Sequence, residues 1–142
     1  MELHFIIPGK PVAKQRVRVV SRGASYTPKE TREFEQLVGG YAYLAGARSV
    51  DDVSMFSVDI IVTQQIPKSW SKARTSAAWN GVYSNHMPDI DNVAKSILDG
   101  LNKVVWKDDK QVAIIKAQKL WGKADNTYVT IKEIHDGYVG ND

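Results

Sequence analysis

Apolar residues recur along the chain with two different periods, and these periods predict a mixture of strands and helices. Alternation, or a short apolar run of β-prone residues, predicts a strand, whereas recurrence every three or four residues predicts a helix. The predicted strands span residues 2–7, 55–63, 112–121 and 127–134. The predicted helices span residues 28–44, about 67–79, and from 89 or 90 to 105.

Local signals refine several of these elements. Thr27 is the predicted N-cap of the first helix, and Pro28 suits the first helical position. Gly100 interrupts the most strongly patterned helix, where glycine costs roughly 1 kcal/mol relative to alanine. The turn-forming stretch 122–126 predicts that the last two strands form an antiparallel hairpin.

The order of these elements predicts an α+β fold with a mixed β-sheet covered by helices. We expect a single domain over residues 1–136, because its length fits one hydrophobic core. Within this domain, we predict that residues 10–27 form an exposed basic hairpin or arm. Residues 137–142 predict a disordered tail.

Composition narrows the chemistry. The 142 residues include no cysteine, which excludes disulfides, cysteine-ligated zinc and a cysteine nucleophile. The first eight residues lack the basic and long apolar regions of a signal peptide, and no apolar run approaches the ~18 residues of a membrane span. We therefore expect a cytoplasmic protein without a membrane partner.

The net charge of +3 is unevenly distributed. Residues 10–29 and 60–88 contain basic side chains and no acidic one. Such segments suit a polyanion, although a solvated basic surface would give the same pattern. The candidate DNA-binding residues are Lys14, Arg16, Arg18, Lys68, Lys72 and Arg74.

The candidate chemistry begins at Asp89 and Asp91, where a helix is predicted to start after Pro88. Carboxylates spaced by two residues suit a hard cation such as Mg²⁺, which prefers oxygen ligands. Aspartates also cap helix N-termini, so a purely structural role stays open. An EF-hand loop does not fit, because its fifth position would be Val93. The preceding residues also lack the buried strand expected before a phosphatase nucleophile.

More charged residues follow along the same helix. Lys95 lies one turn after Asp91, where it could form an exposed ion pair or meet a phosphate. Asp99, one turn further, either supports Lys95 or keeps this face polar, and we favour the latter. Asp108 and Asp109 lie in a charged turn, and only tertiary folding could bring Asp109 to the helix.

Together these motifs resemble the RusA family of Holliday junction resolvases. The pattern runs from Asp89-x-Asp91-Asn92-x-x-Lys95 to Trp106-x-Asp108-Asp109-x-Gln111, and the resemblance is sharpest over residues 88–112. It implies that Asp89, Asp91 and Asp109 bind the metal and that Lys95 is the active-site lysine. One departure is that His86, Met87 and Pro88 stand where the family usually has basic residues.

The resemblance further implies a homodimer that makes paired, symmetric nicks in four-way DNA junctions, using Mg²⁺ or Mn²⁺, in recombination and repair. The alternatives are a nuclease for other branched DNA and a junction-binding protein that does not cleave. Tyr26 and Trp70 could stack on bases. For Trp70, Trp79, Trp106 and Trp121 we favour positions in the core, and we predict no ligand role for His4 or His135.

Overall fold

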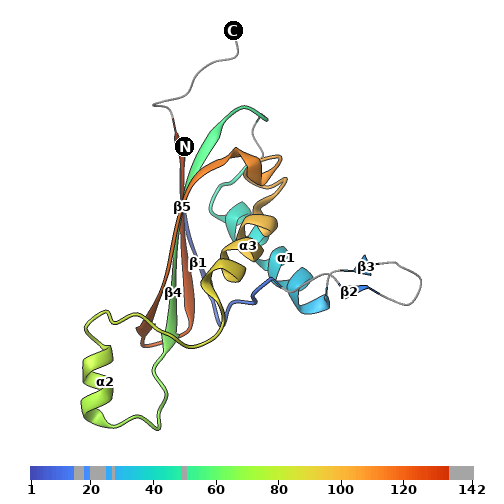
Figure 1. Ribbon diagram of the computed structural model, residues 1–142. Coiled ribbons are helices and arrows are strands. Elements are labelled where there is room, and N and C mark those ends of the chain that lie inside the picture. The colour runs from blue at the N-terminus through green and yellow to red at the C-terminus, as the bar shows by residue number, and fades with distance from the viewer. Residues whose placement is uncertain (15–17, 20–24, 27, 49–50, 135–142) are drawn as a thin grey trace.

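A computed structural model describes residues 1–14, 18–19, 25–26, 28–48 and 51–134 (Figure 1). Arg16, Thr27, His135 and the predicted tail lie outside these residues. The strands are β1 (Glu2–Pro8), β2 (Arg18–Val19), β3 (Ser25–Tyr26), β4 (Met55–Gln65), β5 (Val112–Gly122) and β6 (Asn126–Ile134). The helices are α1 (Lys29–Leu44), α2 (Lys72–Ala78), α3 (Ile90–Leu101) and the 3-10 helix η1 (Asp109–Gln111).

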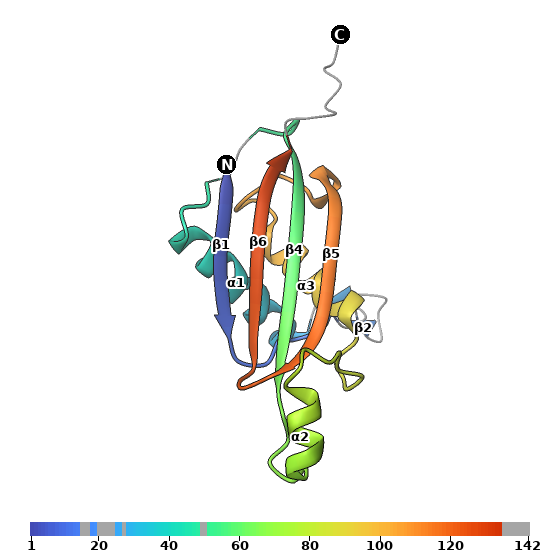
Figure 2. The same cartoon turned by 90° about the vertical axis from the view of Figure 1, so that its left-hand side faces the viewer.

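A mixed four-stranded sheet is the centre of the fold. Its strand order is β1-β6-β4-β5, in which β6 is antiparallel to β1 and β4, whereas β5 is parallel to β4. Helices α1 and α3 cover one face of this sheet, and α2 projects from one end of it (Figures 1 and 2). This arrangement confirms the predicted α+β fold with a mixed sheet.

The predicted hairpin between the last two strands is wrong. Strands β5 and β6 run in opposite directions, but β4 lies between them and pairs with both. The turn after Gly122 therefore connects strands that are not neighbours. Within the segment predicted as a basic hairpin or arm, β2 and β3 pair antiparallel, with Arg18 opposite Tyr26 and Val19 opposite Ser25.

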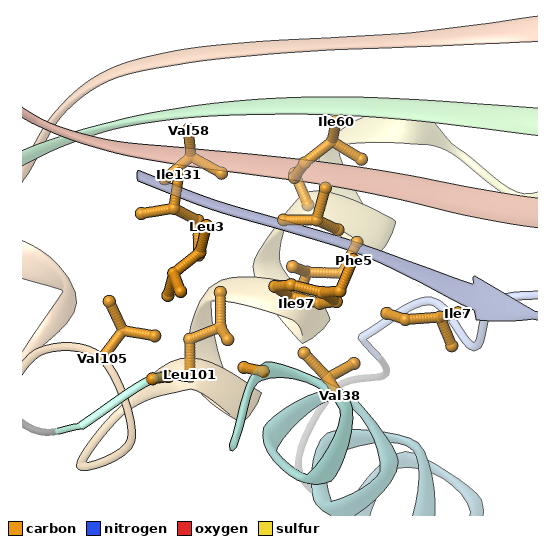
Figure 3. Close-up of a cluster of buried hydrophobic side chains, with 14 of the residues drawn as sticks. Leu3, Phe5, Ile7, Val38, Val58, Ile60, Ile97, Leu101, Val105 and Ile131 are labelled. Carbon is orange, nitrogen blue, oxygen red and sulfur yellow. The ribbon is translucent and has the colours of Figure 1, made fainter. Parts of the chain in front are cut away.

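The core lies between the covered face of the sheet and the two helices (Figure 3). Alternate residues of β1 and β4 point into it, as the period-two pattern requires. From the helices, Val38, Ile97 and Leu101 meet them and are almost completely buried. None of the helices in the described residues has both the length and the apolar character needed to cross a membrane.

Two helices are shorter than their patterns predict, and the first begins differently. Pro28, predicted as the first helical position, is instead the N-cap of α1, so this helix begins one residue later, at Lys29. Helix α2 begins only after Ser71, whose hydroxyl accepts a hydrogen bond from the Arg74 amide at 3.1 Å. Helix α3 ends at Leu101, because Asn102 is extended and Lys103 has a φ of 67°.

The tryptophans divide between core and surface. Trp106 is fully buried against Phe56, and Trp121 is also buried. Trp70 is half-buried beside Trp121, in a second, smaller apolar cluster near α2. A core position is wrong for Trp79, which is 44% exposed.

Gly100 lies where α3 packs closely against α1. A Cβ atom added there would lie 2.8 Å from the Glu35 carbonyl oxygen and 3.0 Å from the Val38 Cβ. The glycine that weakens α3 as an isolated helix is therefore required by its packing.

We predict that Gly100→Ala destabilises the protein by about 1–3 kcal/mol, because the added methyl group overpacks the contact between the helices. Gly40→Ala is the matched control, since a Cβ there meets nothing within 4 Å. It should stabilise by about 0.5–1 kcal/mol through helix propensity. Urea unfolding of both variants measures this, and a stabilised Gly100→Ala would contradict the packing argument.

Candidate active site

Asp89 and Asp91 lie at the N-terminus of α3. Asp89 is the N-cap residue, but its side chain makes no capping hydrogen bond, and the Val93 amide bonds to its backbone oxygen instead. Both aspartates are exposed, and neither carboxylate has a partner among the described residues. Helix capping therefore does not account for these side chains, and both carboxylates are available to a ligand.

The segment before Asp89 is held by side chains from the sheet. The Lys119 ammonium donates to the carbonyl oxygens of His86 and Pro88, at 2.6 and 2.9 Å. The Gln64 amide donates to the Met87 carbonyl oxygen at 2.8 Å. Three successive carbonyl groups are thus fixed by β4 and β5, which sets the direction in which the chain enters α3. Neither Lys119 nor Gln64 was predicted from the sequence, because neither residue belongs to a motif.

Asp108 and Asp109 are adjacent but have different roles. Asp108 caps η1: its carboxylate accepts from the Lys110 amide at 2.8 Å, and the Gln111 side chain accepts from the Lys107 and Asp108 amides. The Asp109 carboxylate instead lies 3.0 Å from the Lys95 ammonium. Tertiary folding therefore does bring Asp109 to the polar face of α3, while Asp108 is explained by local structure.

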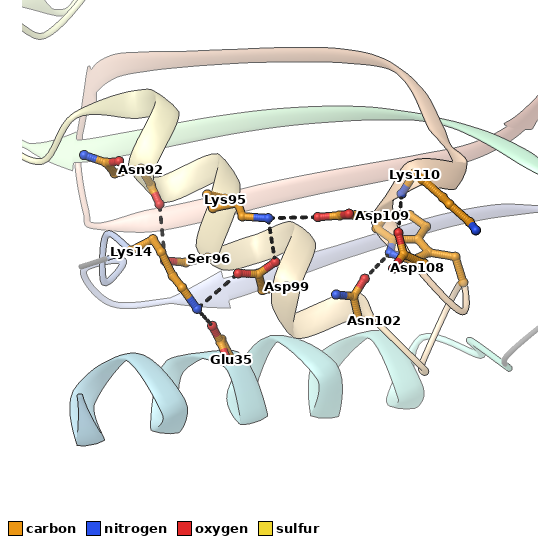
Figure 4. A network of polar contacts seen from close by, with 11 residues as sticks. Lys14, Glu35, Asn92, Lys95, Ser96, Asp99, Asn102, Asp108, Asp109 and Lys110 are labelled. Atoms are coloured by element: carbon orange, nitrogen blue, oxygen red, sulfur yellow. Dashed lines mark hydrogen bonds and ion pairs between the residues drawn. The ribbon is translucent and has the colours of Figure 1, made fainter. Parts of the chain in front are cut away.

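Lys95 is fixed by two carboxylates. Its ammonium lies 3.0 Å from Asp99 and 3.0 Å from Asp109, and it does not pair with Asp91 (Figure 4). The hydrogen bond to Asp109, followed by that to Asp99, raises the pKa of Lys95 above its ordinary value. Asp99 therefore supports Lys95, and the interpretation that it only keeps this face polar is wrong.

A second lysine continues the network on the other side of Asp99. The Lys14 ammonium lies 3.1 Å from Asp99 and 2.7 Å from Glu35 of α1, and its side chain is 22% exposed. These two carboxylates hold Lys14 inside the protein, which separates it from the other predicted DNA-binding residues. Lys14 thus links the start of the basic arm to both helices (Figure 4).

The other predicted DNA-binding residues that the structure describes lie in two separate places. Arg18 begins β2, in the hairpin that projects on the helix side of the sheet (Figure 1). Lys68, Lys72 and Arg74 are exposed in or just before α2. The Arg74 guanidinium lies 3.7 Å from the centre of the Trp70 ring.

The acidic side chains at the start of α3 meet the basic needs of a divalent cation. Carboxylate oxygens are suitable donors, and Mg²⁺ often binds through one or two carboxylates together with waters and substrate phosphates. No three acidic or histidine side chains of the described residues converge on one point. The open pair Asp89 and Asp91 nevertheless fits such a site by chemistry and accessibility, whereas Asp109 is engaged by Lys95.

Accessible carboxylates beside a fixed ammonium group are what an enzyme acting on phosphate esters requires. The family model of endodeoxyribonuclease RusA matches residues 8–132, which include every side chain of this site. The chain therefore belongs to the RusA endodeoxyribonuclease family, and this membership supports a nuclease. The chain is also 30% identical to the uncharacterised protein YqaN of Bacillus subtilis (strain 168), over 93% of this chain and 96% of that protein.

We predict that Lys14→Met destabilises the protein by about 1–3 kcal/mol, between the values typical of exposed and buried ion pairs. Burial opposes the charged form of Lys14, but the hydrogen bonds and charges of Glu35 and Asp99 outweigh it and raise the pKa of Lys14. A raised lysine pKa contributes stability below the unfolded pKa, and this contribution is lost as the pH rises through the folded one.

The stability difference between wild type and Lys14→Met should therefore be constant near neutral pH and shrink above pH ~10.5. Chemical denaturation over this pH range measures it. Lys10→Met is the control, since Lys10 is exposed and has no ion pair among the described residues, and it should change stability by less than about 0.5 kcal/mol. Equal effects of the two substitutions would contradict a structural role for Lys14.

Proposed function

We propose that this protein is a Mg²⁺-dependent, structure-specific endonuclease that resolves Holliday junctions by paired, symmetric nicks. The observation that carries this proposal is the pair of carboxylates at the start of α3, Asp89 and Asp91, which have no partner among the described residues. Asp91 lies one helical turn before Lys95, which is paired with Asp109. Membership of the RusA family supports DNA as the substrate. Mn²⁺ is the expected substitute for Mg²⁺.

In this proposal Asp89 and Asp91 would hold the metal, and Asp109, which is paired with Lys95 in the structure, would be the third ligand. Bound there, Mg²⁺ would supply Lewis-acid polarisation of a phosphate oxygen and a more acidic water. Lys95, which is also paired with Asp99, offsets negative charge that develops on the phosphate. Asp99 acts through Lys95 and is a positioning residue.

Two further features match this substrate. The basic hairpin and α2 project from different sides of the fold and would contact phosphates on separate arms of a branched DNA (Figure 1). Paired nicks require two active sites related by a two-fold axis, so we propose that the protein acts as a homodimer. A location in the cytoplasm and roles in recombination and repair follow from this substrate.

We predict that the protein nicks a synthetic four-way junction at two symmetric positions in Mg²⁺ and not in EDTA. Asp91→Asn and Asp109→Asn should each lower the cleavage rate at least about 100-fold, because each removes a ligand charge. Asp108→Asn is the matched control: asparagine caps as well as aspartate, so its rate should stay within about threefold of wild type.

Denaturing gels of end-labelled strands, with a linear duplex and a flap of the same sequence in parallel, give these rates. Equal cutting of all substrates would indicate a nuclease without junction specificity. Tight junction binding without metal-dependent cutting would indicate a binding protein. Loss of activity in Asp108→Asn but not in Asp109→Asn would contradict the assignment of the two aspartates.

We also predict that Lys72→Ala weakens junction binding and reduces the slope of log K against log salt concentration by about 1, because one phosphate contact is lost. Lys132→Ala is the control, since Lys132 pairs with Glu2 near the end of the sheet opposite to α2 (Figure 2). Fluorescence anisotropy at several salt concentrations measures the slopes. Identical slopes for both variants would exclude a phosphate contact through Lys72.

A further inference from the structure

A pocket of about 430 Å³ lies directly beside the proposed active site. We call it the loop pocket, because His86, Met87 and Pro88 form one of its walls. The rest is formed by the end of β4 with Pro67, by Trp121 of β5, by Lys10 and Pro11 after β1, and by Asp125 on the turn that follows β5. Its volume is within the usual range of ligand sites, roughly 300–1,000 Å³.

The position of the loop pocket ties it to the reaction. Pro88, which lines it, immediately precedes Asp89. The same three-residue wall is fixed by Lys119 and Gln64, whose side chains donate hydrogen bonds to its carbonyl groups. A group in this pocket would therefore sit on a preformed wall, one residue from the first carboxylate.

Flat and apolar groups dominate the pocket walls. The His86 ring packs edge-on against Trp121, with 4.8 Å between ring centres and 84° between planes. Trp70 contacts both rings, so the His86 ring is held although it is exposed. Met87 adds an apolar side chain that is 75% exposed. Such walls suit a planar, uncharged ring.

The pocket is also lined by polar side-chain groups that have no hydrogen-bond partner among the described residues. The Gln65 amide side chain has no partner among the described residues, while its backbone amide donates to one oxygen of Asp125. The second carboxylate oxygen of Asp125 and the Lys10 ammonium also have no partner within the described part of the chain. Amide and carboxylate groups pair with base edges. Asp125 disfavours a bare phosphate.

We propose that the loop pocket binds one unstacked nucleobase of the DNA, next to the phosphate that is cut. This inference rests on the proposed function and deepens it, because the pocket would give the nuclease a preference for particular bases at the nick. The base lies against His86 and Trp121, and its edge meets Gln65 and Asp125.

Base removal combined with side-chain removal tests this proposal. The nicks made by wild type are first mapped, and junctions are then prepared with one abasic site at each nucleotide flanking a nick. Single-turnover cleavage in Mg²⁺ is measured for wild type, His86→Ala and Gln65→Ala. Tyr83→Ala is the control, because Tyr83 is an exposed aromatic residue of the same connection that does not line the pocket.

At one flanking position, base removal should slow wild type by about 10-fold or more, in line with the typical strength of base–aromatic stacking. The same removal should slow His86→Ala and Gln65→Ala by less than about threefold, and Tyr83→Ala as much as wild type. Circular dichroism checks that each variant is folded. Because Gln65 is exposed, Gln65→Ala is expected to fold, so it still tests the pocket if His86→Ala unfolds.

If base removal slows wild type, His86→Ala and Gln65→Ala by the same factor at every flanking position, the loop pocket is not a base site. That result would leave the resolvase proposal intact. Absence of metal-dependent nicking by wild type would overturn the proposed function, and the pocket inference with it.

Discussion

The parallel pairing of β4 with β5 is the constraint on which the rest of the structure depends. Parallel strands cannot be joined by a tight turn, so the chain must cross back over the sheet between Gln65 and Val112. That crossover contains α2, the 84–88 connection and α3. It lays α3 along the covered face and returns the chain so that Asp109, just before β5, reaches Lys95 in the middle of α3.

Charge pairing then fixes the polar side of this crossover. Asp99 and Glu35 hold Lys14, and Asp99 and Asp109 hold Lys95, so one chain of alternating charges joins the arm, both helices and η1. The carboxylates of Asp89 and Asp91, at the start of α3, are not part of this network of ion pairs. The site therefore combines a network in which each carboxylate has a lysine partner with a pair of carboxylates that has none among the described residues, and this contrast motivates the proposed metal site.

Much of the fold was predictable because local patterns reflect burial. Alternation in β1 and β4, and the apolar stripe of α3, gave the correct element types and the α+β class. Strand neighbours were not predictable in the same way, because the turn after Gly122 gives no sign that β4 separates β5 from β6. The end of α3 also escaped prediction, because the apolar residues Val104 and Val105 continue the helical spacing past Leu101.

In the candidate site, too, some residues could be predicted from the sequence and others only from the tertiary structure. Asp89, Asp91 and Lys95 could be selected from spacing along one helix, and the second motif added Asp109. The separate roles of Asp108 and Asp109, the support of Lys95 by Asp99, and the hold of Lys119 on the segment before Asp89 depend on tertiary contacts. Lys14 was selected as a DNA-binding candidate from its basic neighbours, and its ion pairs with Glu35 and Asp99 likewise depend on tertiary contacts.

Binding of Mn²⁺ to the protein without DNA tests the central claim most directly, because it isolates the carboxylates from the rest of the reaction. Electron paramagnetic resonance of free Mn²⁺ gives the affinities of wild type, Asp91→Asn and Asp108→Asn. We expect wild type and Asp108→Asn to bind Mn²⁺ equally, and Asp91→Asn to bind at least about 10-fold more weakly. Equal binding by Asp91→Asn and wild type would show that the start of α3 is not the metal site.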